Sequence, residues 1–313
     1  EVDWTLALGD QSLSEDELVK LANSKSNLVQ IKGEWINIDK EQAEAALEEL
    51  QKRRKNDEYL TPTDLLRITA ELGAEDTNTD FDTATFSPQT QSADDWLAKL
   101  IEGLPDDDLT EENESERFNG ALRPYQRRAL SWLQFLGRLG LGGCLADDMG
   151  LGKTPTALAH IQSRYSDKPT LVICPLSVVH NWEQEVSQFT PDLEVLILHG
   201  AKRPTGDELL ERATSVNIVI STYGTATRDI ENLSKIHWDL VVCDEAQFIK
   251  NHQTNAAIAI RELTADQKIA LTGTPVENRL SELWSILDAI NPGMLGGISW
   301  FKEKFATPIE QKK

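Results

Sequence analysis

The residues with the clearest chemical potential lie in one loop, ADDMGLGKT, from Ala146 to Thr154. An apolar run precedes this loop and a helix-forming segment follows it, which is the order found in phosphate-binding loops. Glycines allow successive backbone N–H groups to turn toward a phosphate at a helix N-terminus, where the helix dipole favours anions. Lys153 is then expected to reach the outer phosphates of a nucleotide and Thr154 to hold Mg²⁺. The predicted nucleotide-binding residues of the loop are Asp148, Met149, Gly150, Leu151, Gly152, Lys153 and Thr154.

One residue departs from the usual pattern of this loop, because Asp147 stands where a glycine is expected. Two simpler explanations therefore stay open from this stretch. The first is a glycine-rich turn that carries Lys and Thr by chance, and the second is the phosphate loop of a kinase or a GTPase. The rest of the chain has to separate these alternatives.

A second reactive group is a pair of adjacent acids that ends an apolar run, in VVCDEAQ from Val241 to Gln247. Side chains alternate along a strand, so the two carboxylates point in different directions. Asp244 can therefore face Mg²⁺ while Glu245 orients and deprotonates an attacking water. A polar turn after a strand is the plain alternative. The predicted catalytic residues are Lys153, Asp244 and Glu245, and the predicted metal ligands are Thr154 and Asp244.

Six short apolar runs with helical periods between them must position these groups. Several of the runs are apolar at consecutive residues, which is typical of parallel strands covered on both faces. The sequence therefore predicts an α/β domain over residues 121–313, with its ligands at the carboxyl ends of the strands. The runs are Gly142 to Ala146, Thr170 to Cys174, Glu194 to Leu198, Asn217 to Ile220, Leu240 to Cys243 and Lys268 to Leu271.

The first third of the chain has a different pattern of apolar residues, and residues 1–104 are expected to form a small α+β accessory module. Alternating segments from Asn27 to Ile31 and from Glu34 to Ile38 predict a hairpin, and helical segments flank it, as in winged-helix modules. Residues 74–91, rich in Thr, Asp, Asn, Ser and Gln, predict a flexible loop. An acidic linker, residues 105–120, follows. It is expected to be a solvated tether, with a DNA mimic as the alternative.

Charge is distributed very unevenly along the 313 residues. The net charge of the chain is −21, and residues 1–120 contribute −19 of it, with 30 Asp and Glu against 11 Lys and Arg. This counts against nucleic-acid binding by the first third, because affinity for phosphates depends on Lys and Arg, and it suggests a protein partner there. Three Cys in apolar runs indicate reduced thiols in a cytoplasmic protein. No apolar run approaches the ~20 residues of a membrane span, so no membrane partner is expected.

The order of the motifs also carries a resemblance. ADDMGLGKT, VVCDEAQ and LTGTPVEN resemble motifs I, II and III of the Swi/Snf-type double-stranded-DNA translocases of helicase superfamily two, which share the Asp at position 147. The segment LRPYQRRALSWL from Leu122 resembles the adenine-reading segment of that family, which implies Gln126 and Arg123 as nucleotide contacts. Gln247, Thr272, Gly273 and Thr274 are implied as residues that couple the nucleotide site to the DNA site.

Two further segments resemble the family's DNA-gripping motifs Ia and Ib. LVICPLSVVHNWEQE begins at Leu171 and ISTY begins at Ile220. Each one joins a strand end to a helix start, which presents N–H groups and hydroxyls to phosphates. Ordinary helix caps are the alternative for each hydroxyl. The implied contacts to the DNA backbone are Pro175, Ser177, Ser221 and Thr222.

The resemblance implies the first RecA-like motor lobe of a bacterial ATP-dependent DNA translocase, with Mg²⁺ and ATP as cofactors and duplex DNA as partner. The accessory module resembles, less specifically, the end of a helicase-associated domain. Only about eighteen residues follow Gly296, so we expect the second lobe to be absent here and turnover by this chain to be slow. The expected location is the cytoplasm, on the nucleoid of a bacterium. A nucleotide-binding scaffold or adaptor, with an acidic partner-binding region, is the alternative function.

Overall fold

The computed structural model describes residues 2–8, 11–13, 28–31, 34–37, 63, 66–67, 84–90, 112–164 and 166–311. The chain divides into two compact units, Glu1–Leu104 and Pro105–Lys313, and each unit is described by itself. Among the described residues, no helix is long and apolar enough to cross a bilayer.

The larger unit is built on a six-stranded parallel sheet, in the order β6-β11-β10-β7-β9-β8. All six apolar runs of the sequence are strands, which confirms the predicted α/β fold. Because β11 is the second strand of that order and β10 the third, the acids at the end of β10 are separated by one strand from β6, which leads into the phosphate loop. The strands are β6 (Gly143–Leu145), β7 (Thr170–Cys174), β8 (Val195–Leu198), β9 (Ile218–Thr222), β10 (His237–Asp244) and β11 (Thr264–Leu271).

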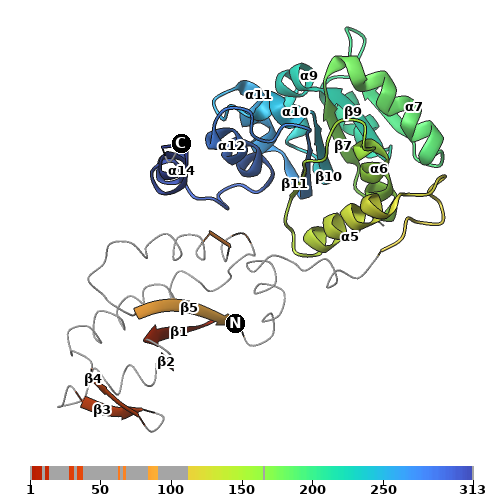
Figure 1. Ribbon diagram of the computed structural model, residues 1–313. Helices are drawn as coiled ribbons and strands as arrows, with labels where there is room; N and C mark the ends of the chain where they lie inside the picture. The colour runs from red at the N-terminus through yellow and green to blue at the C-terminus, as the bar shows by residue number, and fades with distance from the viewer. Residues whose placement is uncertain are drawn as a thin grey trace. The chain divides into compact units, whose positions relative to one another are not determined.

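Helices cover both faces of this sheet (Figure 1). Alternate residues of each strand enter two separate cores, as Val172 and Val242 do on one face and Leu171 and Val241 on the other. The first core packs against α5 (Pro124–Arg138), α6 (Lys153–Ser163) and α7 (Val179–Phe189). The second packs against α8 (Gly206–Thr214), α9 (Tyr223–Arg228), α10 (Ile230–Leu233), α11 (Asn255–Glu262) and α12 (Leu280–Ile290).

Short helical segments complete the unit. Two of them directly follow the carboxyl ends of strands and so belong to the candidate site. They are the 3₁₀ turns η1 (Leu176–Val178) after β7 and η2 (Ala246–Ile249) after β10. At the carboxyl end of the chain lie α13 (Ile298–Phe301), the π-helical turn η3 (Lys302–Ala306) and α14 (Thr307–Glu310).

The N-terminal unit contains two small antiparallel sheets. β3 (Leu28–Ile31) pairs with β4 (Glu34–Asn37), which confirms the predicted hairpin. β1 (Val2–Leu8) pairs with β2 (Gln11–Leu13) and with β5 (Ala84–Thr90). The helices predicted on either side of the hairpin fall mostly outside the described residues, and the winged-helix arrangement stays a prediction.

The flexible loop predicted over residues 74–91 is wrong for residues 84–90, which form β5. This strand pairs with β1 along its whole length, from Val2 opposite Thr90 to Leu8 opposite Ala84. Thr and Phe favour extended backbone, and a partner strand more than seventy residues away satisfies the N–H and C=O groups of the segment. Composition alone indicated a loop because it did not reveal this partner.

The second half of the acidic linker is also not a free tether. The backbone N–H of Glu112 donates to Ser131 Oγ over 2.8 Å, and the carboxylate of Glu114 accepts two hydrogen bonds from Arg127, each of 2.9 Å. Arg127 holds the pKa of Glu114 at about 2, well below its ordinary value. These contacts fasten the linker to α5, because that helix turns cationic and hydroxyl side chains toward it. Residues 105–111 lie outside the described part of the chain.

Candidate nucleotide and nucleic-acid site

The loop between β6 and α6 has the backbone shape that a phosphate requires. Gly150 and Gly152 both lie in the left-handed region, with φ of 84° and 76°. A Cβ atom at Gly152 would lie 2.4 Å from Nε2 of Gln126, so a larger residue there would clash as well as strain the backbone. The helix starts at Lys153, and Pro155 stands in its first turn, where the missing N–H removes no helical hydrogen bond.

Lys153 is held over this loop by backbone carbonyl groups. Its Nζ donates to the carbonyl oxygens of Asp147 over 2.7 Å and of Asp148 over 3.0 Å. An ammonium group has three protons to donate, so one remains for another acceptor. Thr154, the next residue, is half-buried at the start of α6, while Asp148, Met149, Gly150 and Leu151 are exposed.

The predicted adenine-reading residue, Gln126, is joined to the same loop. Its Oε1 accepts from the backbone N–H of Arg123 over 2.9 Å. Its Nε2 donates to the carbonyl oxygens of Leu151 and Gly152 over 3.1 and 3.2 Å. Tyr125 Oη also donates to Leu151, over 3.0 Å. The start of α5 is therefore fastened to the phosphate loop by two neighbouring side chains.

Asp244 ends β10 with a carboxylate that is held from two sides. Oδ1 accepts from the backbone N–H of Glu245 over 2.9 Å, and Oδ2 accepts from the indole Nε1 of Trp182 over 2.8 Å. Burial raises the pKa of Asp244, while the bond from Trp182 and the positive charge of Lys153 act in the opposite direction. Asp244 lies opposite Leu271 of β11, and Leu271 lies opposite Leu145, where β6 leads into the phosphate loop, so the acid and the loop are at the same edge of the sheet.

Glu245 is the only non-glycine residue of the described chain with a left-handed backbone, at φ 51° and ψ 57°. Such a conformation costs about 1–3 kcal/mol and is retained where the surroundings enforce it, often at active sites. It turns the Glu245 side chain away from the strand axis. The carboxylate then accepts a hydrogen bond from Nε2 of Gln247 over 2.7 Å.

A chain of polar contacts runs from Glu245 into the segment after β11. Thr272 Oγ1 donates to Oε1 of Gln247 over 3.3 Å, and the backbone N–H of Thr274 donates to Thr272 Oγ1 over 3.1 Å. A Cβ atom at Gly273 would lie 3.1 Å from Cγ of Met149, so this segment also packs against the phosphate loop. The structure thus brings the predicted coupling residues into contact with the predicted catalytic residues.

The candidate DNA-backbone residues are presented in different ways. Pro175 and Ser177 follow β7 at its carboxyl end, and Ser177 is exposed in η1. Ser221 is fully buried and donates to the carbonyl oxygen of Leu198 over 3.1 Å. Thr222 is the N-cap of α9 and accepts from the backbone N–H of Thr225 over 3.2 Å. Both of the latter hydroxyls are used inside the lobe, which agrees with the helix-cap alternative.

The residues fit a magnesium ion that arrives with a nucleotide. Within the described part of the chain, no three His, Cys, Asp or Glu side chains gather closely enough to hold a metal together. Mg²⁺ is usually bound through one or two protein oxygens, with phosphates and water completing its six ligands. One carboxylate, on Asp244, and one hydroxyl, on Thr154, match that requirement.

Two aromatic residues of the site were not identified from the sequence. Trp182 is buried in the core, and it also donates to Asp244. Tyr223 is buried, stacks on Phe248, and donates through Oη to the backbone carbonyl of Asp244 over 2.8 Å. The only signal available was that Trp182 lies eight residues after the end of β7, near the carboxyl edge of the sheet.

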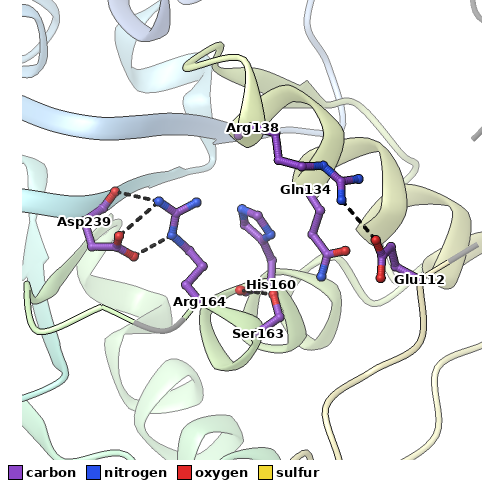
Figure 2. A pocket seen from close by; sticks show the side chains of 8 residues that line it. Glu112, Gln134, Arg138, His160, Ser163, Arg164 and Asp239 are labelled. Carbon is purple, nitrogen blue, oxygen red and sulfur yellow. Dashed lines mark hydrogen bonds and ion pairs between the residues drawn. The ribbon is translucent and has the colours of Figure 1, made fainter. Parts of the chain in front are cut away.

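A second polar cluster lies at the opposite edge of the sheet, around a cavity of about 420 Å³. Figure 2 shows the ring of His160 between two ion pairs, Arg164 with Asp239 on one side and Arg138 with Glu112 on the other. Asp239 stands near the amino end of β10, so this cavity is separate from the site at the carboxyl ends.

Comparisons with known proteins agree with this geometry. The SNF2-related domain family matches residues 125–313, and a family described as SNF2 helicase protein matches residues 1–70. The chain is 38% identical over its whole length to a Bacillus subtilis protein whose printed name is "putative ATP-dependent helicase/translocase YwqA", and it spans 35% of that protein. It is 39% identical over 60% of its length to the TATA-binding protein-associated factor MOT1 of Saccharomyces cerevisiae, spanning 11% of it.

A solved structure gives the same result. The SWI2/SNF2 ATPase core of Sulfolobus solfataricus in complex with double-stranded DNA is 44% identical to this chain, with a TM-score of 0.57. The match covers 65% of this chain and 42% of that core. The sheet and its helices therefore correspond to part of a larger ATPase core in that relative.

Proposed function

Because this chain belongs to the SNF2-related family, we propose that residues 121–313 form the first of two motor lobes of an ATP-dependent double-stranded-DNA translocase. The observation that supports this most directly is the hydrogen-bonded series from Glu245 through Gln247 to Thr272. It joins a candidate hydrolytic residue to the segment that the family places between nucleotide and DNA. The second lobe is proposed as the partner that completes the site.

Mg-ATP would bind at the carboxyl edge of the sheet. The free proton of the Lys153 ammonium group and the N–H groups at the start of α6 hold the outer phosphates. Thr154 and Asp244 hold Mg²⁺, which supplies charge neutralisation on the phosphate oxygens. Gln126 and Arg123 at the start of α5 contact the base, and exchange of the Gln126 contacts to Leu151 and Gly152 for adenine contacts would report its binding.

Hydrolysis is assigned to Glu245. Its carboxylate accepts the proton of a water aligned with the terminal phosphate, and the Gln247 amide holds that carboxylate in place over 2.7 Å. Thr272 bonds to the other end of the same amide. A shift of the segment from Thr272 to Thr274 when DNA binds would therefore reorient Glu245, which couples the two ligands.

Duplex DNA would lie across the loops that follow β7 and β9. The exposed Ser177 and the N–H groups at the start of η1 and α7 contact backbone phosphates, and Pro175 shapes the turn. Ser221 and Thr222 keep the second loop in shape through their internal bonds, and its N–H groups provide the contact. Such contacts fix the position of the protein on the duplex without recognising the base sequence. A motor that steps along any duplex requires this property.

The test is ATP hydrolysis by the intact protein, measured with and without duplex DNA and with ATP against GTP. Duplex should stimulate hydrolysis of ATP, and the Glu245→Gln protein should bind nucleotide without turning it over. Hydrolysis that is indifferent to DNA and to Glu245→Gln would reject the proposal. A preference for GTP would instead favour the GTPase explanation of the phosphate loop.

A further inference from the structure

Trp182 connects the candidate DNA loop to the candidate metal ligand. It lies in the first turn of α7, and this helix begins at Val179, directly after the exposed turn η1. The indole is fully buried, and its Nε1 donates to Oδ2 of Asp244 over 2.8 Å. One rigid side chain therefore spans from the helix that follows the DNA loop to the end of β10.

This bond restrains the position of the Asp244 carboxylate. An indole carries a single N–H and has few rotamers, and a buried donor does not exchange its partner with water. The second carboxylate oxygen is held by the N–H of Glu245. Each carboxylate oxygen therefore accepts one hydrogen bond, from Trp182 or from Glu245, and each retains a lone pair for a further partner.

The same face of α7 carries a second polar group aimed into the lobe. Glu185, one turn after Trp182, accepts from Asn181 Nδ2 on Oε1 over 2.7 Å, and its Oε2 is buried with no hydrogen-bond partner. Burial raises the pKa of Glu185, and the negative charge of Asp244 adds to that effect. A helix that only packed on the sheet would not need two polar groups on this face.

We propose that Trp182 is a positioning residue for Asp244, and that it transmits movement of the DNA loop to the metal ligand. The inference rests on the proposed function, since it takes Asp244 as the ligand of Mg²⁺. DNA phosphates that contact η1 shift the start of α7, and the indole moves the carboxylate with it. Nucleotide-bound Mg²⁺ is then held more or less tightly according to whether DNA is present.

The chain offers a matched control in Trp238. This residue is also fully buried, and its indole Nε1 donates to the backbone carbonyl of Leu233 over 3.0 Å, in the core on the other face of the sheet. Trp182→Phe and Trp238→Phe each remove one buried indole N–H and a similar volume. A loss caused by core packing alone should therefore appear in both variants.

The first measurement is nucleotide binding as a function of Mg²⁺ concentration, with a fluorescent ATP analogue and the full chain. Residues that hydrogen-bond to metal ligands contribute about 10–100-fold to metal affinity, so Trp182→Phe should raise the Mg²⁺ concentration required by about tenfold or more. Trp238→Phe should leave it unchanged, with thermal unfolding as the check on folding. Equal Mg²⁺ requirements in the two variants would overturn the inference.

The second measurement uses the unsubstituted chain, so that it holds even if Trp182→Phe does not fold. The indole N–H resonance of Trp182, assigned by side-chain-to-backbone correlations in the unsubstituted chain, should shift when Mg-nucleotide binds and shift again when duplex DNA is added. That of Trp238 should stay in place. A Trp182 resonance indifferent to both ligands would reject the inference alone, whereas an unsubstituted chain that binds no Mg-nucleotide would reject the proposed function as well.

Discussion

The two edges of the parallel sheet use their polar residues in different ways. At the carboxyl edge, Glu245 has a left-handed backbone, Lys153 bonds to carbonyl groups of its own loop, and the side chains of Met149 and Leu176 are 76% and 60% exposed. Strain, unused donors and exposed apolar surface all raise the free energy of the folded chain. Their concentration at one edge indicates that this edge is shaped for ligands.

At the amino edge most polar groups are paired inside the protein, with the buried Nδ1 of His160 as an exception. Oε1 of Gln267 accepts from Arg164 Nη1 and faces His160 Nε2 at 2.8 Å, while its Nε2 donates to the carbonyl oxygens of Leu133 and Leu141. This fixes the amide orientation and places the proton of neutral His160 on Nε2. Asp239 accepts two bonds from the side of the Arg164 guanidinium group, from Nε on Oδ2 and from Nη2 on Oδ1. The comparison suggests that this edge stabilises the lobe and the other edge performs chemistry.

The largest predicted effect is on ATP hydrolysis, and it tests the role assigned to the carboxyl edge of the sheet. Glu245→Gln should lower ATP hydrolysis by the intact protein by about 10²-fold or more, because general-base catalysis contributes about 10²–10⁴-fold. Its melting temperature should stay close to that of the unsubstituted protein, since Gln preserves the side-chain volume. A melting temperature that fell with the activity would show that this edge also stabilises the fold.

The matching change at the amino edge is Arg164→Met. It leaves Asp239 buried without its partner, and breaking a buried ion pair from one side costs about 3–5 kcal/mol of unfolding free energy. Denaturant unfolding measures this, and nucleotide affinity of the folded variant should not change. Lys168→Met is the control, because its pair with Asp266 is about 40% exposed on both sides, and surface pairs contribute about 0–1 kcal/mol. Equal losses in the two variants would contradict the comparison.

Lowering the pH should reduce the stability of the folded lobe, because His160 is buried at the amino edge of the sheet. Burial lowers the pKa of His160 to about 4, below the ordinary value of 6.5, so the unfolded chain takes up a proton first as the pH falls. The contribution of His160 to stability is therefore fully present above pH 6.5 and is lost as the pH falls to about 4, by roughly 3 kcal/mol in total. This loss is measured as the free energy of unfolding of the unsubstituted chain and of His160→Gln at pH 7 and pH 5. The difference between the two pH values should shrink in the variant, and an unchanged difference would assign the acid sensitivity to other groups.

The smallest effect concerns the linker, which borders the cavity at the amino edge through Glu112. Glu114→Gln weakens a two-bond contact with Arg127 and should cost about 1 kcal/mol. Glu112→Gln, at a more exposed pair with Arg138, should cost less. Urea unfolding of both variants separates them. If neither variant changes the free energy of unfolding, the linker contacts α5 without stabilising it. The linker would then act as the solvated tether that the sequence predicts.

DNA affinity tests whether the acidic segment 105–116 has a role beyond its contacts with α5. If the acidic segment 105–116 shields the DNA loops, its deletion should tighten DNA binding, because removal of negative charge strengthens attraction for phosphates. Fluorescence anisotropy with a labelled duplex at two salt concentrations measures the affinity. An affinity that stays constant would restrict the segment to its contacts with α5.

Local sequence was sufficient where a residue's environment is set by its near neighbours. Consecutive apolar residues predicted all six strands, and Gly150, Gly152 and Lys153 predicted the loop. The segment β5 was missed because its partner β1 is more than seventy residues away. The contacts of Glu114 were missed because the linker's acidity is visible in the sequence, whereas the side of α5 that Arg127 faces is not.

The chain's amino-acid order thus establishes its family, its α/β sheet and the identity of the acids and glycines that could bind a nucleotide. Hydrophobic periodicity and the residue types of a loop are local properties, so they can be identified from the sequence without knowledge of the fold. Which hydroxyls face outward, how Gln247 meets Thr272, and that Trp182 holds Asp244 all depend on how distant segments pack against one another. Hydrogen bonds need atoms within about 3 Å in a fixed direction, and only the folded lobe creates that proximity.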